Sequence, residues 1–179
     1  MVETKIFFKV PKQQAAEIYK SYAAFEKQHG DREGIELVIA GRRRFQYEEE
    51  LKANSRNYDA WFDYARLEEK YGSTAEQVRD VYERAIANVP PSDEKRHWRR
   101  YVWLWINYAV FEELDCEDPD RARAVWNACV QLLRAKSLSF CKVWVFFAQF
   151  EVRQGQVAAA RKLLGTALGV APKPKLYRA

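Results

Sequence analysis

"WFDYARLEE", residues 61–69, and "WINYAVFEE", residues 105–113, repeat one pattern 44 residues apart, Trp-x-x-Tyr-Ala-x-x-Glu-Glu. Two further stretches fit the pattern with other aromatic residues, "YKSYAAFE" at 19–26 and "WVFFAQFE" at 144–151. The four starts lie 42, 44 and 39 residues apart. Matches at a near-constant period predict an array of one structural unit, whose function lies in the surface that the array builds.

A second pattern follows each copy of the first. It reads "RDVYERAIANVP" at 79–90 and "RKLLGTALGVAP" at 161–172, with the shorter forms "RFQYEEE" at 44–50 and "RAVWNAC" at 123–129. The first pattern leads the second by 18, 18 and 17 residues in the last three copies and by 25 in the first. The seven additional residues equal two helical turns, which lengthen a helix while its buried face stays in phase.

The spacing within each pattern is helical. Positions i, i+3 and i+7 fall on one face of an α-helix, so each aromatic pair and its Glu line a single stripe. We predict an all-α fold without a sheet, an α-solenoid of four antiparallel helix pairs. The expected helices cover residues 12–29, 32–53, 57–71, 74–88, 93–114, 119–133, 138–154 and 156–170.

Capping residues agree with these boundaries. Gly72 is expected to end one helix, and Ser73 with Glu76 forms a capping box for the next. Ser92 and Asp118 are further N-cap candidates. Pro119 then takes the favoured first helical position.

The two patterns together resemble the half-a-tetratricopeptide (HAT) repeat, which occurs almost wholly in RNA-processing proteins. Longer stretches, such as "RRRFQYEEELKANSRNYDAWFDYARLEE" (42–69) and "LGTALGVAPKPKLYRA" (164–179), are similar to crooked-neck-like pre-mRNA splicing factors. Departures are minor: Ser55 and Arg134 stand where a HAT helix commonly ends in Pro, and Leu164 replaces an aromatic residue.

The resemblance implies four repeats, at 12–55 (with a long second helix), 56–91, 92–136 and 137–173. It also implies an internal segment of a longer array, with the tail of a preceding repeat at 1–11 and the start of another at 174–179. The motif residues are expected to be structural: Tyr19, Tyr22, Glu26, Arg44, Tyr47, Trp61, Tyr64, Glu68, Arg79, Tyr82, Pro90, Trp105, Tyr108, Glu112, Arg123, Trp126, Trp144, Phe147, Glu151, Arg161 and Pro172.

The function that the resemblance implies is that of a nuclear scaffold of the spliceosome, within the NineTeen-associated complex. Its partners would be Myb-like and other HAT-repeat splicing factors, close to small nuclear RNA or pre-mRNA. Neither catalysis nor a cofactor is implied. A different HAT family, the scaffolds of messenger-RNA 3′-end cleavage, shares the repeat but not the longer stretches.

Composition agrees with a soluble intracellular protein. Hydrophobic residues make up 48% and charged residues 31% of the 179-residue chain, and no apolar stretch approaches the ~20 residues of a membrane span. No signal peptide is expected. Cys116, Cys129 and Cys141 lack metal-ligand spacing, which argues against a zinc site or a disulfide framework. No catalytic constellation recurs, and neighbouring acids such as Glu68 and Glu69 point about 100° apart on a helix.

Charge is unevenly distributed, which leaves direct RNA binding as an alternative. Residues 1–90 have 15 basic against 16 acidic residues, whereas residues 91–179 have 15 against 9. The basic stretch 95–100 could bind phosphates while Trp98 stacks on a base, although a solvated helix start is the favoured interpretation. The candidate contacts to RNA or to an acidic partner are Lys95, Arg96, Trp98, Arg99, Arg100, Lys162, Lys173 and Lys175.

The repeated Glu lies on the stripe that buries the aromatic residues, where an ionised carboxylate needs a partner. Only one basic position recurs in step with it, so we expect each Glu to bond to a repeat Arg, or to a Tyr such as Tyr64 or Tyr108. The following acids, Glu69 and Glu113, are then the solvated ones. Self-association is expected through apolar surface at the chain ends, at Phe7 and Phe8 or near Val157 and Leu164.

Overall fold

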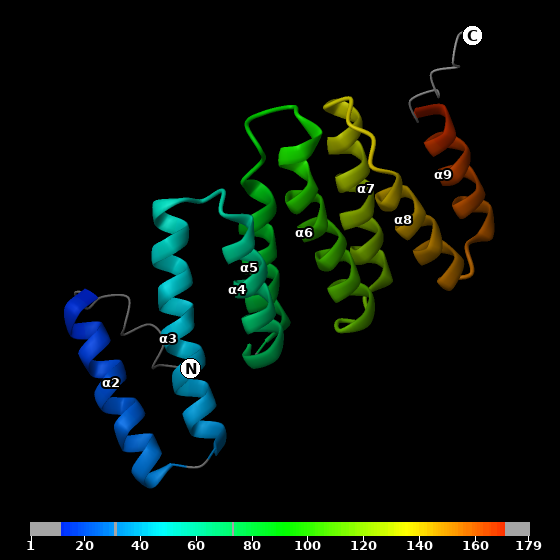
Figure 1. Cartoon of the computed structure of the whole chain (residues 1–179). Helices are drawn as coiled ribbons and strands as arrows, with labels where there is room; N and C mark the ends of the chain where they lie inside the picture. The colour runs from blue at the N-terminus through cyan, green and yellow to red at the C-terminus, as the bar shows by residue number, and fades with distance from the viewer. Residues whose placement is uncertain (1–11, 31, 73, 171–179) are drawn as a thin grey trace, which may run out of the picture. The chain divides into compact units, whose positions relative to one another are not determined.

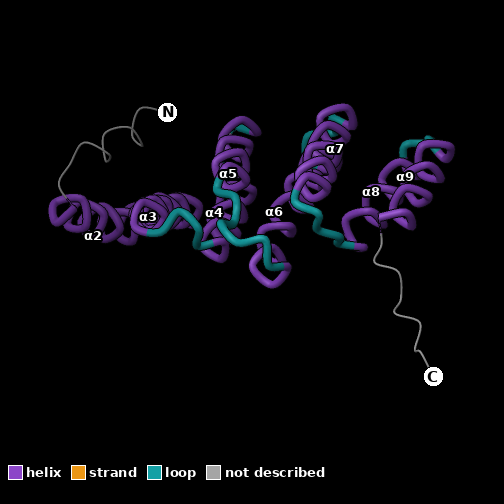
Figure 2. The backbone as a smooth tube through the Cα atoms, turned by 90° about the horizontal axis from the view of Figure 1, so that it is seen from above, coloured by secondary structure: helices purple, strands orange, loops and turns teal. Residues whose placement is uncertain are grey.

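The computed structural model describes residues 12–30, 32–72 and 74–170, which form eight α-helices and their connections (Figure 1). Helices and loops account for all of these residues, and no strand occurs among them (Figure 2). The predicted all-α fold is confirmed. The chain divides into two units, residues 1–88 and 89–179.

Unit 1 contains two helix pairs in chain order: α2 (Lys12–His29) with α3 (Arg32–Ala53), and α4 (Tyr58–Tyr71) with α5 (Ala75–Ala87). Each helix packs against the next, so α3 joins the two pairs (Figure 1). Aromatic side chains fill the space between them. Trp61 stacks on Tyr64 with ring centroids 6.4 Å apart, and Tyr47 stacks on Tyr64 at 5.7 Å.

Unit 2 repeats this arrangement with α6 (Lys95–Leu114) beside α7 (Pro119–Ala135) and α8 (Cys141–Arg153) beside α9 (Val157–Val170). Its core is also aromatic. Trp126 of α7 stacks on Phe147 of α8 at 5.8 Å, which ties the two pairs together. These helix pairs are the units from which α-solenoids are built.

The helix ends agree with the predicted boundaries to within three residues, and the caps agree in part. Asp118 accepts a hydrogen bond from the backbone N–H of Arg121 at 3.0 Å, with Pro119 at the start of α7, as predicted. Gly72 ends α4, as predicted. The prediction that Ser92 is an N-cap is wrong, because the N-cap of α6 is Glu94. The Ser92 hydroxyl oxygen instead accepts a hydrogen bond from the backbone N–H of Glu94 at 3.1 Å. At α5 the N-cap is Thr74, whose side chain makes no capping bond, and Ser73 lies outside the described residues.

Helices α3 and α6 are longer than the others, because in each the pattern of buried residues extends beyond the repeat motif. The first repeat was expected to lengthen its second helix, and α3 runs unbroken for 22 residues. The 20-residue α6 begins earlier than its repeat motif requires, because Trp98 lies seven residues before Trp105 on the same helical face. Trp98 donates its indole N–H to the Ser92 carbonyl at 2.7 Å, just as Trp61 donates to Ser55 at 2.8 Å. In α6 the tryptophan that anchors the preceding loop is therefore Trp98, two turns before the motif tryptophan.

Candidate functional site

The repeated glutamates lie in the interior, and two of them meet the repeat arginines. Glu68 of α4 is 4% exposed and accepts two bonds from Arg44 of α3, at 2.5 Å from Nε and 3.1 Å from Nη2. Arg44 also donates to the carbonyl oxygen of Tyr71 at 3.0 Å. A planar guanidinium thus satisfies the carboxylate and a helix-end carbonyl together.

Glu151 of α8 repeats this geometry in unit 2. It is 3% exposed and accepts bonds from Arg123 of α7, at 2.8 Å from Nε and 3.2 Å from Nη2. The hydrogen bond to Glu151 raises the pKa of Arg123. In both units the pair joins the second helix of one helix pair to the first helix of the next. The predicted Arg–Glu contact is confirmed at these two positions.

The remaining two glutamates are Glu112 and Glu26. Glu112 of α6 is fully buried and forms an ion pair with Arg121 of α7 at 3.6 Å. Arg79 of α5 pairs with Glu76 at 2.5 Å. Glu26 of α2 is half-buried and forms no ion pair with a described residue. The pattern seen at Glu68 and Glu151 would require an arginine before α2, and residues 1–11 contain none.

The predicted tyrosine donor takes another partner. Tyr64 donates to Glu48 of α3 at 2.9 Å rather than to Glu68. Arg84 of α5 also holds Glu48, through two bonds of 2.8 Å. Burial raises the pKa of Glu48, but the bonds from Arg84 and Tyr64 outweigh it and lower the pKa overall. The sequence reasoning missed this network, because Glu48 is no repeat position; its only signal was its place one turn after Arg44 on the packed side of α3.

The prediction that the second acids are solvated is wrong for Glu113, whereas Glu69 is exposed, as predicted. Glu113 has a side chain only 5% exposed and binds Arg153 of α8 at 2.6 and 2.7 Å. Glu69 accepts a bond of 2.5 Å from the Tyr82 hydroxyl. Adjacent helical residues point about 100° apart, so each second acid turns from the motif's own face toward a neighbouring helix.

Most motif side chains are used for packing. The buried ones are Tyr19, Trp61, Tyr64, Glu68, Tyr82, Pro90, Trp105, Tyr108, Glu112, Trp126, Trp144, Phe147 and Glu151. Arg44, Tyr47, Arg79 and Arg123 are half-buried, whereas Tyr22 and Arg161 are exposed. Pro172 lies outside the described residues. Residues between the motif positions therefore form most of the surface that a partner could contact.

The basic candidates separate into surface and core. Lys95, Arg96, Arg99, Arg100 and Lys162 are exposed, as contact residues must be. Trp98 is fully buried against Tyr101, so its assignment as a base-stacking residue is wrong: it shares the inward face with Trp105. Lys173 and Lys175 lie outside the described residues.

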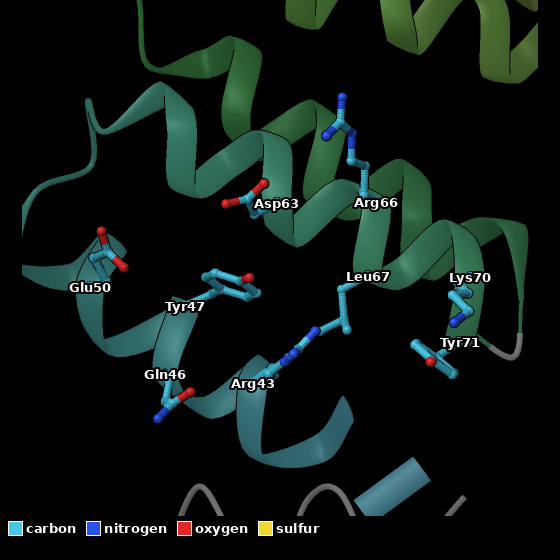
Figure 3. A pocket seen from close by; sticks show the side chains of 9 residues that line it. All are labelled: Arg43, Gln46, Tyr47, Glu50, Asp63, Arg66, Leu67, Lys70 and Tyr71. Carbon is cyan, nitrogen blue, oxygen red and sulfur yellow. The ribbon is translucent and has the colours of Figure 1, made fainter. Parts of the chain in front are cut away.

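An open groove runs along the contact of α3 and α4 in unit 1, with a volume of about 750 Å³. Side chains from both helices line it at one-turn intervals (Figure 3). They are Arg43, Gln46, Tyr47 and Glu50 of α3 and Asp63, Arg66, Leu67, Lys70 and Tyr71 of α4. A mixed charged lining around a tyrosine suits a peptide better than a small apolar ligand.

The described residues contain no group of three or more His, Cys, Asp or Glu side chains placed to hold a metal ion. None of their helices is long and apolar enough to cross a membrane. Cys116, Cys129 and Cys141 are free thiols.

Comparison with known proteins adds the family. Residues 43–175 match the family model described as "Pre-mRNA-splicing factor Syf1/CNRKL1 N-terminal HAT repeat". The chain is 56% identical over 170 residues to Crooked neck-like protein 1 of Homo sapiens, covering 95% of this chain and 20% of that protein. It is 55% identical over 170 residues to pre-mRNA-splicing factor clf1 of Aspergillus fumigatus, covering 95% and 25%. It is 51% identical over 169 residues to protein crooked neck of Drosophila melanogaster, covering 94% and 24%.

The chain thus spans about a fifth to a quarter of the length of these relatives. The family match covers both units and includes the Arg44–Glu68 and Arg123–Glu151 contacts. The chain belongs to the HAT-repeat family of Syf1/CNRKL1-type pre-mRNA-splicing factors.

Proposed function

We propose that this chain is a non-enzymatic protein-binding scaffold in pre-mRNA splicing and that it works in the nucleus. The observation that carries this proposal is the identity of 50% or more, over nearly the whole chain, to proteins named as pre-mRNA-splicing factors or crooked neck proteins. The proposed repeats are residues 12–55, 56–91, 92–136 and 137–173. A HAT array offers a long surface of stacked helices, which suits assembly rather than catalysis.

The distribution of residues supports a scaffold. The polar motif residues Glu68, Arg44, Glu151 and Arg123 are used in contacts between helices. Exposed positions between them differ from repeat to repeat, so each repeat can present different chemistry to a partner. The proposed partners are other spliceosomal proteins, among them Myb-like and HAT-repeat factors of the NineTeen-associated complex. The cited relatives have splicing names, so a scaffold of 3′-end cleavage is not proposed.

Affinity purification from nuclear extract tests this function. The chain, immobilised, is expected to enrich spliceosomal proteins over a control helical-repeat protein of similar charge, and to retain them after ribonuclease treatment. Protein-mediated contacts survive loss of RNA, whereas contacts through RNA do not. Equal recovery of splicing proteins on the control would contradict the proposal.

Direct RNA binding is the second candidate, favoured by the exposed cations at the start of α6. Lys95, Arg96 and Arg99 are exposed there, although Arg96 pairs with Glu94 at 2.6 Å. A salt titration with single-stranded RNA separates the two functions. Phosphate binding should weaken steeply with salt and should fall on Arg99→Glu substitution, while protein recovery from extract is unaffected.

A further inference from the structure

Basic and acidic side chains lie toward opposite ends of the groove between α3 and α4. The helices are antiparallel neighbours, so Arg43 and Lys70 lie toward one end, and Glu50 and Asp63 toward the other (Figure 3). Seven residues of α3 separate Arg43 from Glu50, a rise of about 10 Å. The groove therefore presents a cationic end and an anionic end at a fixed separation.

Several of these charges have no ion-pair partner. Arg43, Asp63 and Arg66 are exposed and form no ion pair with any described residue, although Asp63 and Arg66 are one turn apart on α4. Charges on the packed sides of α3 and α4 behave differently: Arg44 holds Glu68, and Arg84 of α5 holds Glu48. Arg43, Asp63 and Arg66 thus remain available to an external ligand, whereas Glu50 also accepts a hydrogen bond from Asn57.

The lining between the two ends is partly apolar. Leu67 is 6% exposed, and the Tyr47 ring is held in place by its stack on Tyr64 at 5.7 Å. The Tyr47 hydroxyl makes no hydrogen bond to a described residue and lies among the groove side chains (Figure 3). An apolar or aromatic side chain can pack on this lining and a backbone group can bond to the hydroxyl.

We propose that this groove binds an extended segment of a partner protein in which an acidic residue and a basic residue lie four positions apart with an apolar or aromatic residue midway between them. Alternate residues of an extended chain point to the same side, so all three side chains face the groove, and the two charged residues lie about 13 Å apart, within reach of the charged ends. A helical occupant fits less well, because it needs an apolar stripe and Leu67 is the single aliphatic residue of the lining. RNA fits less well because phosphates would face Glu50 and Asp63. The inference rests on the proposed scaffold function and names the chemistry of one partner segment.

A peptide titration of the complete 179-residue chain tests this inference. The probe is the blocked heptapeptide Ser-Asp-Ala-Phe-Ala-Lys-Ser, and its binding is measured by two-dimensional NMR of the ¹⁵N-labelled chain at low salt. Amide shifts are expected in residues 43–50 and 63–71. A peptide with Ser in place of Asp and Lys, and the Arg43→Glu or Asp63→Lys chains, should each bind at least fivefold more weakly. Arg42→Glu is the matched control, because Arg42 is exposed but does not line the groove, and should bind like the parent.

Three outcomes would overturn the inference: no saturable binding of the probe, equal affinity for the groove variants and the parent, or shifts confined to other helices. Displacement of the probe by a uridine hexanucleotide would assign the groove to nucleic acid instead and would also overturn it. Recovery of splicing proteins from extract is measured in parallel. If they are recovered equally by the parent and the Asp63→Lys chain, the groove inference fails alone; if neither recovers them, the scaffold function fails.

Discussion

Buried carboxylates are the residue-scale feature that sets this fold apart from an ordinary hydrophobic helix pair. Glu68, Glu112 and Glu151 are 4%, 0% and 3% exposed, in positions where burial alone is costly. Arg44 and Arg123 offset that cost through two bonds each. Because each of these arginines lies on the helix before its glutamate, the contact links successive helix pairs.

Removal of the arginine should therefore be strongly destabilising. Arg44→Ala leaves Glu68 buried without its partner, and we expect the free energy of unfolding to fall by about 3–5 kcal/mol. Urea denaturation followed by far-ultraviolet circular dichroism measures the change. The adjacent exposed Arg42→Ala serves as control and should shift stability by no more than about 0.5 kcal/mol. Similar midpoints for Arg44→Ala and the parent would contradict a structural role of the pair.

Glu48 predicts a pH dependence. Bonds from Arg84 and Tyr64 overcome the effect of burial and hold its pKa below the ordinary value of 4.5. A carboxyl with a lowered folded-state pKa stabilises the fold above its unfolded pKa and loses that contribution as pH falls through the folded value. Stability should thus decrease from about pH 5 downward, and Glu48→Gln should flatten this part of the profile. An unchanged acid slope in Glu48→Gln, by urea titration at several pH values, would argue against it.

The thiols should differ in reactivity. Cys129 is 1% exposed, and burial raises its pKa to about 12, so almost no thiolate forms at neutral pH. Cys141 is exposed at the start of α8. We expect iodoacetamide to modify Cys141 rapidly and Cys129 only after unfolding, as measured by peptide mass spectrometry. Equal rates at the two thiols in the folded chain would rule out the packed environment of Cys129.

For individual residues, the sequence predicted the type of contact, a buried Arg–Glu pair, better than it predicted which two residues form it. The period placed Glu68 and Glu151 on the buried stripe and identified the recurring arginine as their candidate donor. It left open whether that arginine comes from the same repeat, because helix-pair packing decides the contact. For the same reason the sequence predicted the wrong partner for Tyr64. Its hydroxyl donates to Glu48 on α3, not to the repeated glutamate Glu68.

At the scale of the helix, capping residues decide where several elements begin. Asp118 caps α7 through a 3.0 Å bond, whereas Thr74 precedes α5 without a side-chain capping bond. These two positions form a natural comparison. Asp118→Ala should reduce stability by about 1 kcal/mol, and Thr74→Ala by clearly less, in thermal denaturation followed by circular dichroism. Equal losses at the two positions would show that the Asp118 bond contributes little.

Helix lengths were predictable wherever the apolar period continued past the motif. The additional seven residues of the first copy predicted the unbroken α3. The long α6 also lies within the predicted helix 93–114, but the burial of Trp98 was missed, since its charged neighbours suggested a surface position. The missing signal was its spacing: Trp98 follows Ser92 by six residues, as Trp61 follows Ser55, and precedes Trp105 by seven. Periodicity was a better guide to burial here than the polarity of adjacent residues.

At the scale of the whole molecule, two of the helices with exposed apolar residues, α9 and α2, carry them on one face. On α9, Val157, Leu164 and Leu168 are 46%, 43% and 80% exposed at spacings of seven and four residues, which place them on one face. On α2, Ile18 and Phe25 are 42% and 58% exposed at a spacing of seven. Contiguous apolar surface of this kind favours association between molecules. Phe7 and Phe8, the other residues expected at such a contact, lie outside the described residues.

These two faces differ in sequence, so contacts between them are heterologous: the α9 face of one molecule meets the α2 face of another. Such contacts do not require symmetry, and the mean mass should rise steadily with concentration in sedimentation velocity experiments. Leu164→Lys or Phe25→Lys should each suppress the rise, because either change removes one side of every contact. Leu114→Lys is the control, since Leu114 is 64% exposed and belongs to α6 rather than to α2 or α9. If only one of the two variants suppresses association while the other leaves a discrete dimer, the contact is between identical faces; if the mass is constant over the whole concentration range, neither face associates.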